Sequence, residues 1–112
     1  MPADKEKPST HIIQVTTIDS LKPGQMSCFD VNNRRIILAR VDNDYFAFDE
    51  MCSHEDAELW KGALRKDHIE CPLHGSRFCL RTGNPIEEPA TVPISTYPVT
   101  LKNDSIYVEL SD

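Results

Sequence analysis

Two short segments of the 112-residue chain each combine a cysteine with a histidine, a pairing that can hold a transition metal. The first carries Cys52 and His54, and the second carries Cys71 and His74, with Gly75 directly after it. Thiolate suits iron–sulfur clusters and zinc, while neutral imidazole suits zinc or iron. Two cysteines and two histidines therefore fit either structural zinc or a 2Fe–2S centre in which two imidazoles replace two thiolates on one iron.

The order of these residues favours the dinuclear centre. Common zinc modules place like residues together, as C-x₂₋₄-C followed by H-x₃₋₅-H. Here the order along the chain is Cys, His, Cys, His, so each segment gives one residue of each kind. This arrangement suits a cluster held between two loops, with both thiolates on one iron and both imidazoles on the other. Spacing alone still leaves zinc open.

The pattern and its surroundings resemble the cluster signature of the Rieske-type ferredoxins. The resemblance runs from about Ile12 to Leu110 and includes framing residues on both sides of the two segments: Phe46-Ala47, Leu59, Gly62, Arg77-Phe78 and Thr82-Gly83. It implies an all-β Rieske fold, with an antiparallel β-sandwich base and an inserted small cluster-binding subdomain. It also implies one Rieske-type 2Fe–2S cluster. Cys52 and Cys71 would bind the inner iron, and His54 and His74 would bind the outer, more exposed iron.

Four further residues are candidates to surround that cluster. In high-potential members of the family, a serine at the position of Ser76 donates a hydrogen bond to a bridging sulfide, and a tyrosine stands where this chain has Phe78. The alternative for Ser76 is a turn residue that bonds its own backbone. Trp60 and Phe78 are candidates to shield the cluster, although we favour ordinary core packing for both. A proline-rich loop from Pro85 to Pro93, which includes Pro89, would either pack beside the cluster or serve as a rigid connector.

The remaining cysteines point to a low-potential ferredoxin in a reducing cytoplasm. High-potential members clamp the cluster loops with a disulfide, but the matching positions here are Ala57 and Leu73, so that bridge cannot form. We expect Cys28 and Cys79 to be small, buried or half-buried residues on strands. A chain without structural disulfides fits a reducing compartment.

Length and composition predict one domain without a membrane span. The hydrophobic fraction of 39% is ordinary for a soluble globular chain, and no run approaches the length of a membrane helix. Residues 1–10 are polar and proline-bearing, which predicts a disordered tail, and residues 11–112 form the expected Rieske domain. The net charge of −6 argues against nucleic acid and anionic membranes as partners.

Short apolar and β-branched runs alternate with turn residues, which predicts small sheets and little helix. The expected cluster-binding subdomain covers about 51–89, inserted between the strands of the base. One helical turn is expected at Asp19–Leu21, and hairpin tips at 32–33, 42–44 and 102–104, because Asn and Asp tolerate turn dihedrals. The expected strands are His11–Thr17, Met26–Val31, Arg34–Val41, Tyr45–Phe48, Val92–Leu101 and Ser105–Leu110.

The predicted function is one-electron transfer rather than catalysis, because four protein side chains and two sulfides would saturate both irons. The partners expected from the resemblance are a flavoprotein ferredoxin reductase and a terminal oxygenase, as in aromatic-ring dioxygenase systems, and the expected state is a monomer. The oxygenase itself is not expected, because its mononuclear iron needs a site of two histidines and a carboxylate. Only His11 and His68 remain here, and we expect no second domain to hold such a site. We expect both of these histidines at the surface. The alternatives are the cluster-bearing small subunit of a nitrite reductase-type complex and a redox sensor.

Overall fold

The computed structural model describes residues 10–52, 57–72, 75–87 and 92–111, which form short antiparallel strands and two 3₁₀ helices. In chain order the elements are β1 (Thr10–Thr17), η2 (Ile18–Ser20), β2 (Met26–Val31), β3 (Arg34–Val41), β4 (Asp44–Asp49), η3 (Leu59–Lys61), β5 (Ala63–Leu64), β6 (His68–Glu70), β7 (Arg77–Cys79), β8 (Pro85–Glu87), β9 (Thr96–Tyr97), β10 (Val99–Lys102) and β11 (Ser105–Ser111). The expected all-β class is confirmed.

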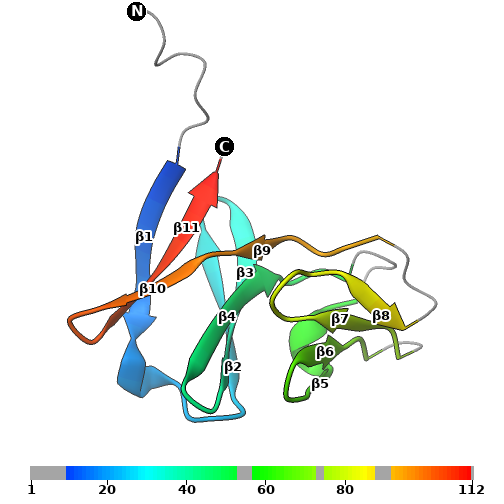
Figure 1. Cartoon of the computed structure of the whole chain (residues 1–112). Coiled ribbons are helices and arrows are strands. Elements are labelled where there is room, and N and C mark those ends of the chain that lie inside the picture. The colour runs from blue at the N-terminus through cyan, green and yellow to red at the C-terminus, as the bar shows by residue number, and fades with distance from the viewer. Residues whose placement is uncertain (1–9, 53–56, 73–74, 88–91, 112) are drawn as a thin grey trace, which may run out of the picture.

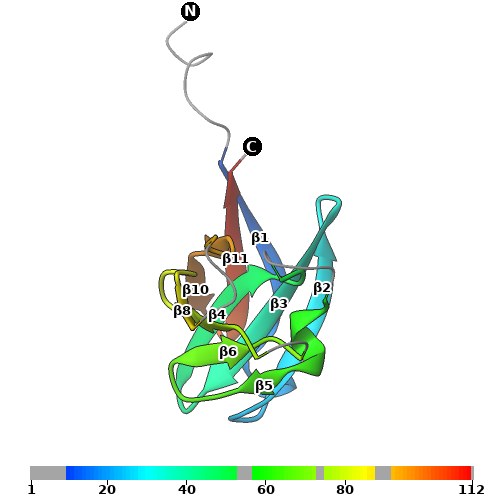
Figure 2. The ribbon, with the colours of Figure 1, turned by 90° about the vertical axis from the view of Figure 1, so that its right-hand side faces the viewer.

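The strands form three sheets. Strands β1, β11 and β10 make one sheet, β2, β3, β4 and β9 make the second, and β5 to β8 make the third. Figure 1 shows the second sheet in the middle, with the first sheet on one side and the third on the other. The view in Figure 2 looks onto the third sheet, which covers part of the middle one. The first two sheets form the sandwich base, and the third is inserted between β4 and β9, which pair with each other.

The middle sheet is buried on both faces because β3 contains a continuous apolar run, Ile36–Ala39, with no polar side chain to turn toward water. Side chains of a strand alternate between its two faces. Ile36 and Leu38 accordingly join the core shared with the first sheet, whereas Ile37 and Ala39 join the core shared with the third sheet. Strand β4 repeats this division, since Ala47 packs in the first core and Phe48 in the second.

Asparagine and aspartate make the hairpin tips as expected, because they adopt positive φ more readily than other non-glycine residues. Asn32 and Asn33 between β2 and β3 have φ of 50° and 68°, and Asn103 and Asp104 between β10 and β11 have φ of 50° and 66°. The tip between β3 and β4 carries its positive φ at Asp42. The helical turn expected at Asp19–Leu21 is the 3₁₀ helix η2, one residue earlier.

One expectation about the strands needs correction. The run from Val92 to Leu101 is not one strand but two, β9 and β10, which belong to different sheets and are separated by Pro98. Proline has no backbone N–H and cannot continue a ladder. The third sheet was not expected strand by strand, because its members are only two or three residues long. Of the expected tail, residues 1–9 lie outside the described residues, and Thr10 already belongs to β1.

No helix among the described residues is long and apolar enough to cross a membrane.

Candidate metal centre

Two similar loops present the cysteines of the sequence motif. Met51 and Glu58 form an isolated β-bridge that closes the first loop, and Glu70 pairs with Arg77 at the ends of β6 and β7 to close the second. Each closed loop contains six residues, 52–57 and 71–76, and in each the cysteine comes first.

The same backbone hydrogen bond supports the cysteine in both loops. The Cys52 amide donates to the Ala57 carbonyl at 2.9 Å, and the Cys71 amide donates to the Ser76 carbonyl at 2.7 Å. At the base of the second loop, Arg77 Nε also lies 3.4 Å from Glu70 Oε1, an ion pair between the two closing residues. Main-chain hydrogen bonds thus hold the backbone of each cysteine at the start of its loop.

Both cysteines are buried in the same core. Cys52 is 6% exposed and Cys71 is 2% exposed, and both belong to the core between the middle sheet and the third sheet, together with Phe48, Leu59 and Phe78. Neither thiol forms a disulfide. Two thiols in one apolar core, each at the start of a supported loop, are suited to the thiolate side of a metal centre from which water is excluded.

The segment that follows the first loop packs directly on the strand that leads into the second. Gly62, at the end of η3, approaches the Glu70 carbonyl so closely that a Cβ added at residue 62 would stand 1.9 Å from that oxygen. Only glycine fits such a contact without moving the backbone. Because Glu70 directly precedes Cys71, this contact fixes the separation between the two loops.

The two described residues of the donor set, Cys52 and Cys71, fit an iron–sulfur centre. Both thiols are buried and neither forms a disulfide, as the thiolate-bound iron of a Cys₂His₂ 2Fe–2S centre requires. The imidazoles of the set, His54 and His74, lie outside the described residues. Within the described ranges no group of three metal-binding side chains occurs, so the full donor set stays a prediction.

The other two cysteines are half-buried strand residues, as expected. Cys28 lies on β2, where burial is the main cause of a raised pKa of its thiol and a hydrogen bond with the Glu50 side chain is the second. Cys79 ends β7, where a hydrogen bond with the Thr82 side chain lowers the pKa of its thiol. They lie on strands of different sheets and form no disulfide.

The residues expected around the cluster differ in their surroundings. Phe78 is fully buried in the core that holds both cysteines, which confirms core packing for this side chain. Core packing is wrong for Trp60, which is 43% exposed on η3 and has the Lys61 ammonium 5.4 Å from its ring centroid. Ser76 is completely buried at the end of the second loop. Pro89 lies outside the described residues.

The two remaining histidines also differ. His11 on β1 is exposed, as expected. The surface position expected for His68 is wrong, because its side chain is 19% exposed on β6, with Nδ1 3.0 Å from Asp67 Oδ1. The backbone pairing of β6 with β7 holds His68 in the third sheet, opposite Cys79.

Sequence reasoning missed a charged pair beside the first loop. Glu50, two residues before Cys52, is 5% exposed, and its Oε2 accepts a hydrogen bond from Arg35 Nη2 at 2.9 Å. Arg35 Nε also pairs with Asp30 at 3.1 Å. No pattern of residues indicates this pair, because a charged residue at a strand end is exposed in most proteins.

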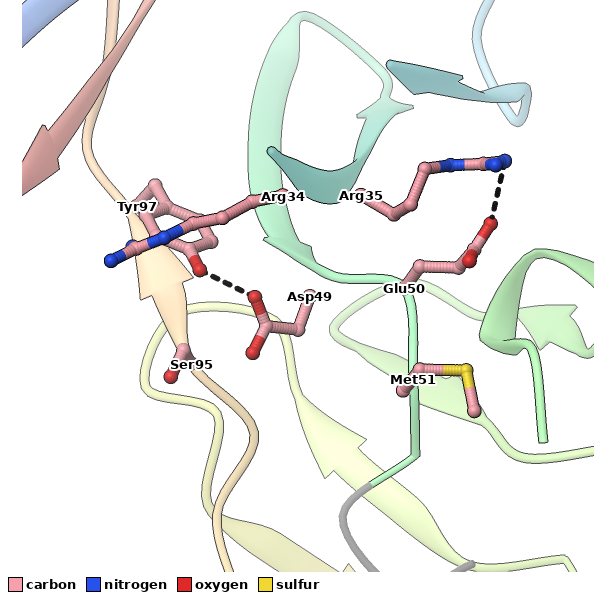
Figure 3. A pocket seen from close by; sticks show the side chains of 7 residues that line it. All are labelled: Arg34, Arg35, Asp49, Glu50, Met51, Ser95 and Tyr97. Atoms are coloured by element: carbon pink, nitrogen blue, oxygen red, sulfur yellow. Dashed lines mark hydrogen bonds and ion pairs between the residues drawn. The ribbon is translucent and has the colours of Figure 1, made fainter. Parts of the chain in front are cut away.

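An open cavity of about 470 Å³ lies where the chain leaves the middle sheet and returns to it. Figure 3 shows the Glu50 carboxylate turned toward Arg35 on one side and Asp49 toward Tyr97 on the other. The Tyr97 hydroxyl donates to Asp49 Oδ1, and burial, with the Asp49 carboxylate, raises the pKa of Tyr97 to about 12. The cavity is lined by Arg34, Arg35, Asp49, Glu50, Met51, Ser95 and Tyr97.

Comparison with known families decides between zinc and iron–sulfur. The family model described as the Rieske [2Fe-2S] domain matches residues 11–98, most of the chain and both cysteine loops. The chain belongs to the Rieske [2Fe-2S] family. This membership supports an iron–sulfur cluster rather than structural zinc.

The relatives of this Rieske chain are ferredoxins of dioxygenase systems. It is 36% identical to the ferredoxin component of biphenyl 2,3-dioxygenase from Rhodococcus jostii (strain RHA1), over 88% of this chain and 92% of the relative. The ferredoxin of carbazole 1,9a-dioxygenase from Nocardioides aromaticivorans IC177 is 36% identical with a TM-score of 0.83, covering 87% of this chain and 95% of that one. A ferredoxin solved in complex with the oxygenase of carbazole 1,9a-dioxygenase is 33% identical with a TM-score of 0.81, covering 87% and 91%.

A more distant likeness bears on the alternative function. A chain named as the small subunit of an NADH-dependent nitrite reductase from Mycobacterium tuberculosis has a TM-score of 0.81 but only 18% identity, over 91% of this chain and 96% of that one. At this identity the likeness shows the Rieske fold alone. The Rieske chain is an electron carrier of the ferredoxin type, since its closer relatives are the electron-carrying rather than the catalytic components of their systems.

Proposed function

We propose that the chain carries one 2Fe–2S cluster and passes single electrons from a flavoprotein ferredoxin reductase to a terminal oxygenase, in the cytoplasm. Cys52 and Cys71 would hold one iron, and His54 and His74 would hold the other. The observation that carries the proposal is the placement of the two cysteines, buried in one core and each first in a loop closed by the same backbone contacts.

The residues around the cysteines suit a carrier that must change charge without changing shape. When bound, the cluster supplies a one-electron redox couple. The Cys52 and Cys71 amides are already occupied by the Ala57 and Ser76 carbonyls, so the loops are closed without help from the cluster. Phe78 and Leu59, both fully buried, exclude water from the thiol side. A site held in this way needs little rearrangement when an electron arrives or leaves.

The choice of partners rests on the relatives and on charge. One relative was solved in complex with an oxygenase, and the net charge of −6 favours a partner with a basic docking face. None of the four cysteines, all of which are described, forms a disulfide, which suits a reducing compartment. The nitrite reductase alternative is supported only by the shared fold.

Cysteine substitutions test the cluster and its ligands. We expect Cys52→Ser and Cys71→Ser to lose the visible absorption of the cluster, together with its iron and acid-labile sulfide, because each removes a thiolate from one iron. The matched controls are Cys28→Ser and Cys79→Ser, which remove thiols of the same chain outside the two loops. These variants should keep two irons and two sulfides per chain. A wild-type protein that held one zinc and no sulfide would contradict the proposal.

Electron transfer is tested separately with the reconstituted protein. We expect anaerobic titration with dithionite to consume one electron per chain. Replacement of the ferredoxin component in a reconstituted biphenyl 2,3-dioxygenase assay should then support ring oxidation that depends on the added chain. A chain that holds the cluster but accepts no electron from any flavoprotein reductase would leave the cofactor assignment standing and contradict the carrier role.

A further inference from the structure

Glu50 is an unusual residue in this molecule. Among the described residues, Glu50 and Ser76 are the buried polar or charged side chains, and Glu50 alone carries an ionisable carboxylate. A buried charge is costly unless it is paired and hydrogen-bonded. The cost is met by Arg35, whose Nη2 lies 2.9 Å from Glu50 Oε2.

The backbone of Glu50 holds this carboxylate at the base of the first cysteine loop. Its amide donates to the Arg35 carbonyl at 3.1 Å, and its own carbonyl accepts from the Leu59 amide, just after the loop, at 2.8 Å. Cys52 is two residues further along, so the two Cα atoms are at most about 7 Å apart. The backbone that carries the Glu50 carboxylate is therefore held close to a residue that would bind the cluster.

Arg35 is the accessible member of the pair. Its side chain is 51% exposed, whereas the Glu50 side chain is 6% exposed. Its Nε bonds to Asp30 on β2, which is 77% exposed. Figure 3 shows the Arg35 side chain extended from β3 to meet the Glu50 carboxylate beside the open cavity. The pair thus combines a negative charge shielded from solvent with a positive charge that solvent and salt can reach.

We propose that the two charges of the Arg35–Glu50 pair shift the reduction potential of the cluster in opposite directions and largely cancel in the wild-type protein. This inference rests on the proposed cluster at Cys52, His54, Cys71 and His74. An added electron makes the centre more negative, so the buried Glu50 carboxylate opposes reduction and the Arg35 guanidinium favours it. In a poorly solvated site, two charges interact more strongly than they do at the same distance in water. The pair brings two opposite effects close to balance.

Charge-neutralising variants separate this role from a purely structural one. Glu50→Gln, which removes the negative charge, should raise the midpoint potential, and Arg35→Gln, which removes the positive charge, should lower it. We expect each to change the ratio of reduced to oxidised protein at a fixed potential by about threefold, or about 28 mV at 59 mV per tenfold. The double variant should return close to the wild-type value, because both charges are then absent.

Asp30→Asn is the matched control, since it removes another negative partner of Arg35 that is largely exposed. We expect it to shift the potential less than Glu50→Gln does, because water screens the exposed charge. Arg35→Lys keeps the positive charge and should stay closer to wild type than Arg35→Gln. Shifts of the same sign in Glu50→Gln and Arg35→Gln, or no shift in either, would overturn the proposal.

Two checks keep the result interpretable. Iron and sulfide content, measured before each titration, shows whether a cluster is present, so absence of the cluster from the wild-type protein contradicts the proposed function and not the role of the pair. If Glu50→Gln does not fold around a cluster, Arg35→Gln is measured alone. A fall in its potential supports the proposal, and an unchanged or higher potential overturns it.

Discussion

Tyr97 lies on β9, the strand that follows the third sheet, and its side chain contacts the end of β4. Its hydroxyl donates to the Asp49 carboxylate, and the Asp49 amide donates to the Ser95 carbonyl at 3.0 Å. Residues 49 to 95 include the third sheet and both cysteine loops, so these contacts close the chain at the base of the whole insertion. A single phenol thus helps to hold the cysteine loops against the sandwich.

Because the pKa of Tyr97 is raised to about 12, this contact should weaken at alkaline pH, where the hydroxyl loses its proton. An unfolded tyrosine has a pKa of about 10, so the folded state binds the proton more tightly. The contribution of Tyr97 to stability is complete below pH 10 and is lost as the pH rises from about 10 to about 12. We expect the free energy of unfolding in urea to fall over this interval more steeply in wild type than in Tyr97→Phe, which keeps the ring but has no proton to lose.

The absorbance of phenolate at 295 nm provides an independent measurement. The difference between the titration curves of wild type and Tyr97→Phe isolates Tyr97 and should show its midpoint near 12. A midpoint near 10 in that difference curve would contradict the proposed burial and hydrogen bond.

At the scale of elements, Gly83 connects the β7–β8 hairpin to the segment that leads back to β9. Its φ is +80°, its carbonyl accepts from the Ile94 amide at 2.9 Å, and a Cβ added there would stand 2.0 Å from the Ile94 carbonyl oxygen. Gly83→Ala must therefore both hold a left-handed conformation and push the returning segment away. We expect it to lower the free energy of unfolding by more than about 2 kcal/mol.

Gly24, in the turn before β2, is the matched control. Its φ of +86° is similar, but nothing lies within 4 Å of an added Cβ. Gly24→Ala should cost only the backbone term, about 1 kcal/mol. Denaturant unfolding of the two variants gives the comparison, and equal losses would show that the contact between Gly83 and Ile94 contributes nothing.

The same scale shows what a sequence can and cannot predict here. The base strands follow from apolar alternation and from turn residues such as Asn32 and Asn33, which are local signals. Strands β5 to β8 are two or three residues long and carry no period of their own, so only their tertiary contacts define them. Pro98 was the available signal for the break between β9 and β10.

The candidate site divides in a similar way. Cys52 and Cys71 could be predicted, because residue type and spacing reveal a donor set directly. Glu50 and Arg35 could not, because their pairing joins β3 to a loop that follows β4, and exposure is the usual state of both residue types. Trp60 shows the opposite error, since a large aromatic residue suggests the core and yet is 43% exposed.

At the scale of the whole molecule, the cysteine core and the paired ends of β1 and β11 lie on opposite sides of the middle sheet. Thr10 pairs with Ser111, so the ends of β1 and β11 lie together on the first sheet. In both views the third sheet lies away from these ends (Figures 1 and 2). The middle sheet, buried on both faces, separates the core that holds the cysteines from the core of the sandwich.

Residues of the inserted third sheet and its loops, together with the net charge of the chain, indicate where the reduction potential of the proposed cluster should lie. The resemblance to high-potential Rieske proteins breaks down at Phe78, which cannot donate the hydrogen bond that their tyrosine provides, and at Ala57 and Leu73, which cannot form their disulfide. Phe78 is completely buried in the core that holds both cysteines, and its side chain has no hydrogen-bond donor to offer there. The net charge of −6 further disfavours an added electron.

We therefore expect a midpoint potential toward the low end of the Rieske range of about −150 to +300 mV. Spectroelectrochemical titration of the purified protein at pH 7 measures it directly. Added salt should raise the potential slightly, because screening weakens the repulsion between the acidic surface and the added electron. A midpoint above about +150 mV would show that neither the absent tyrosine hydroxyl nor the acidic charge of the chain governs the couple.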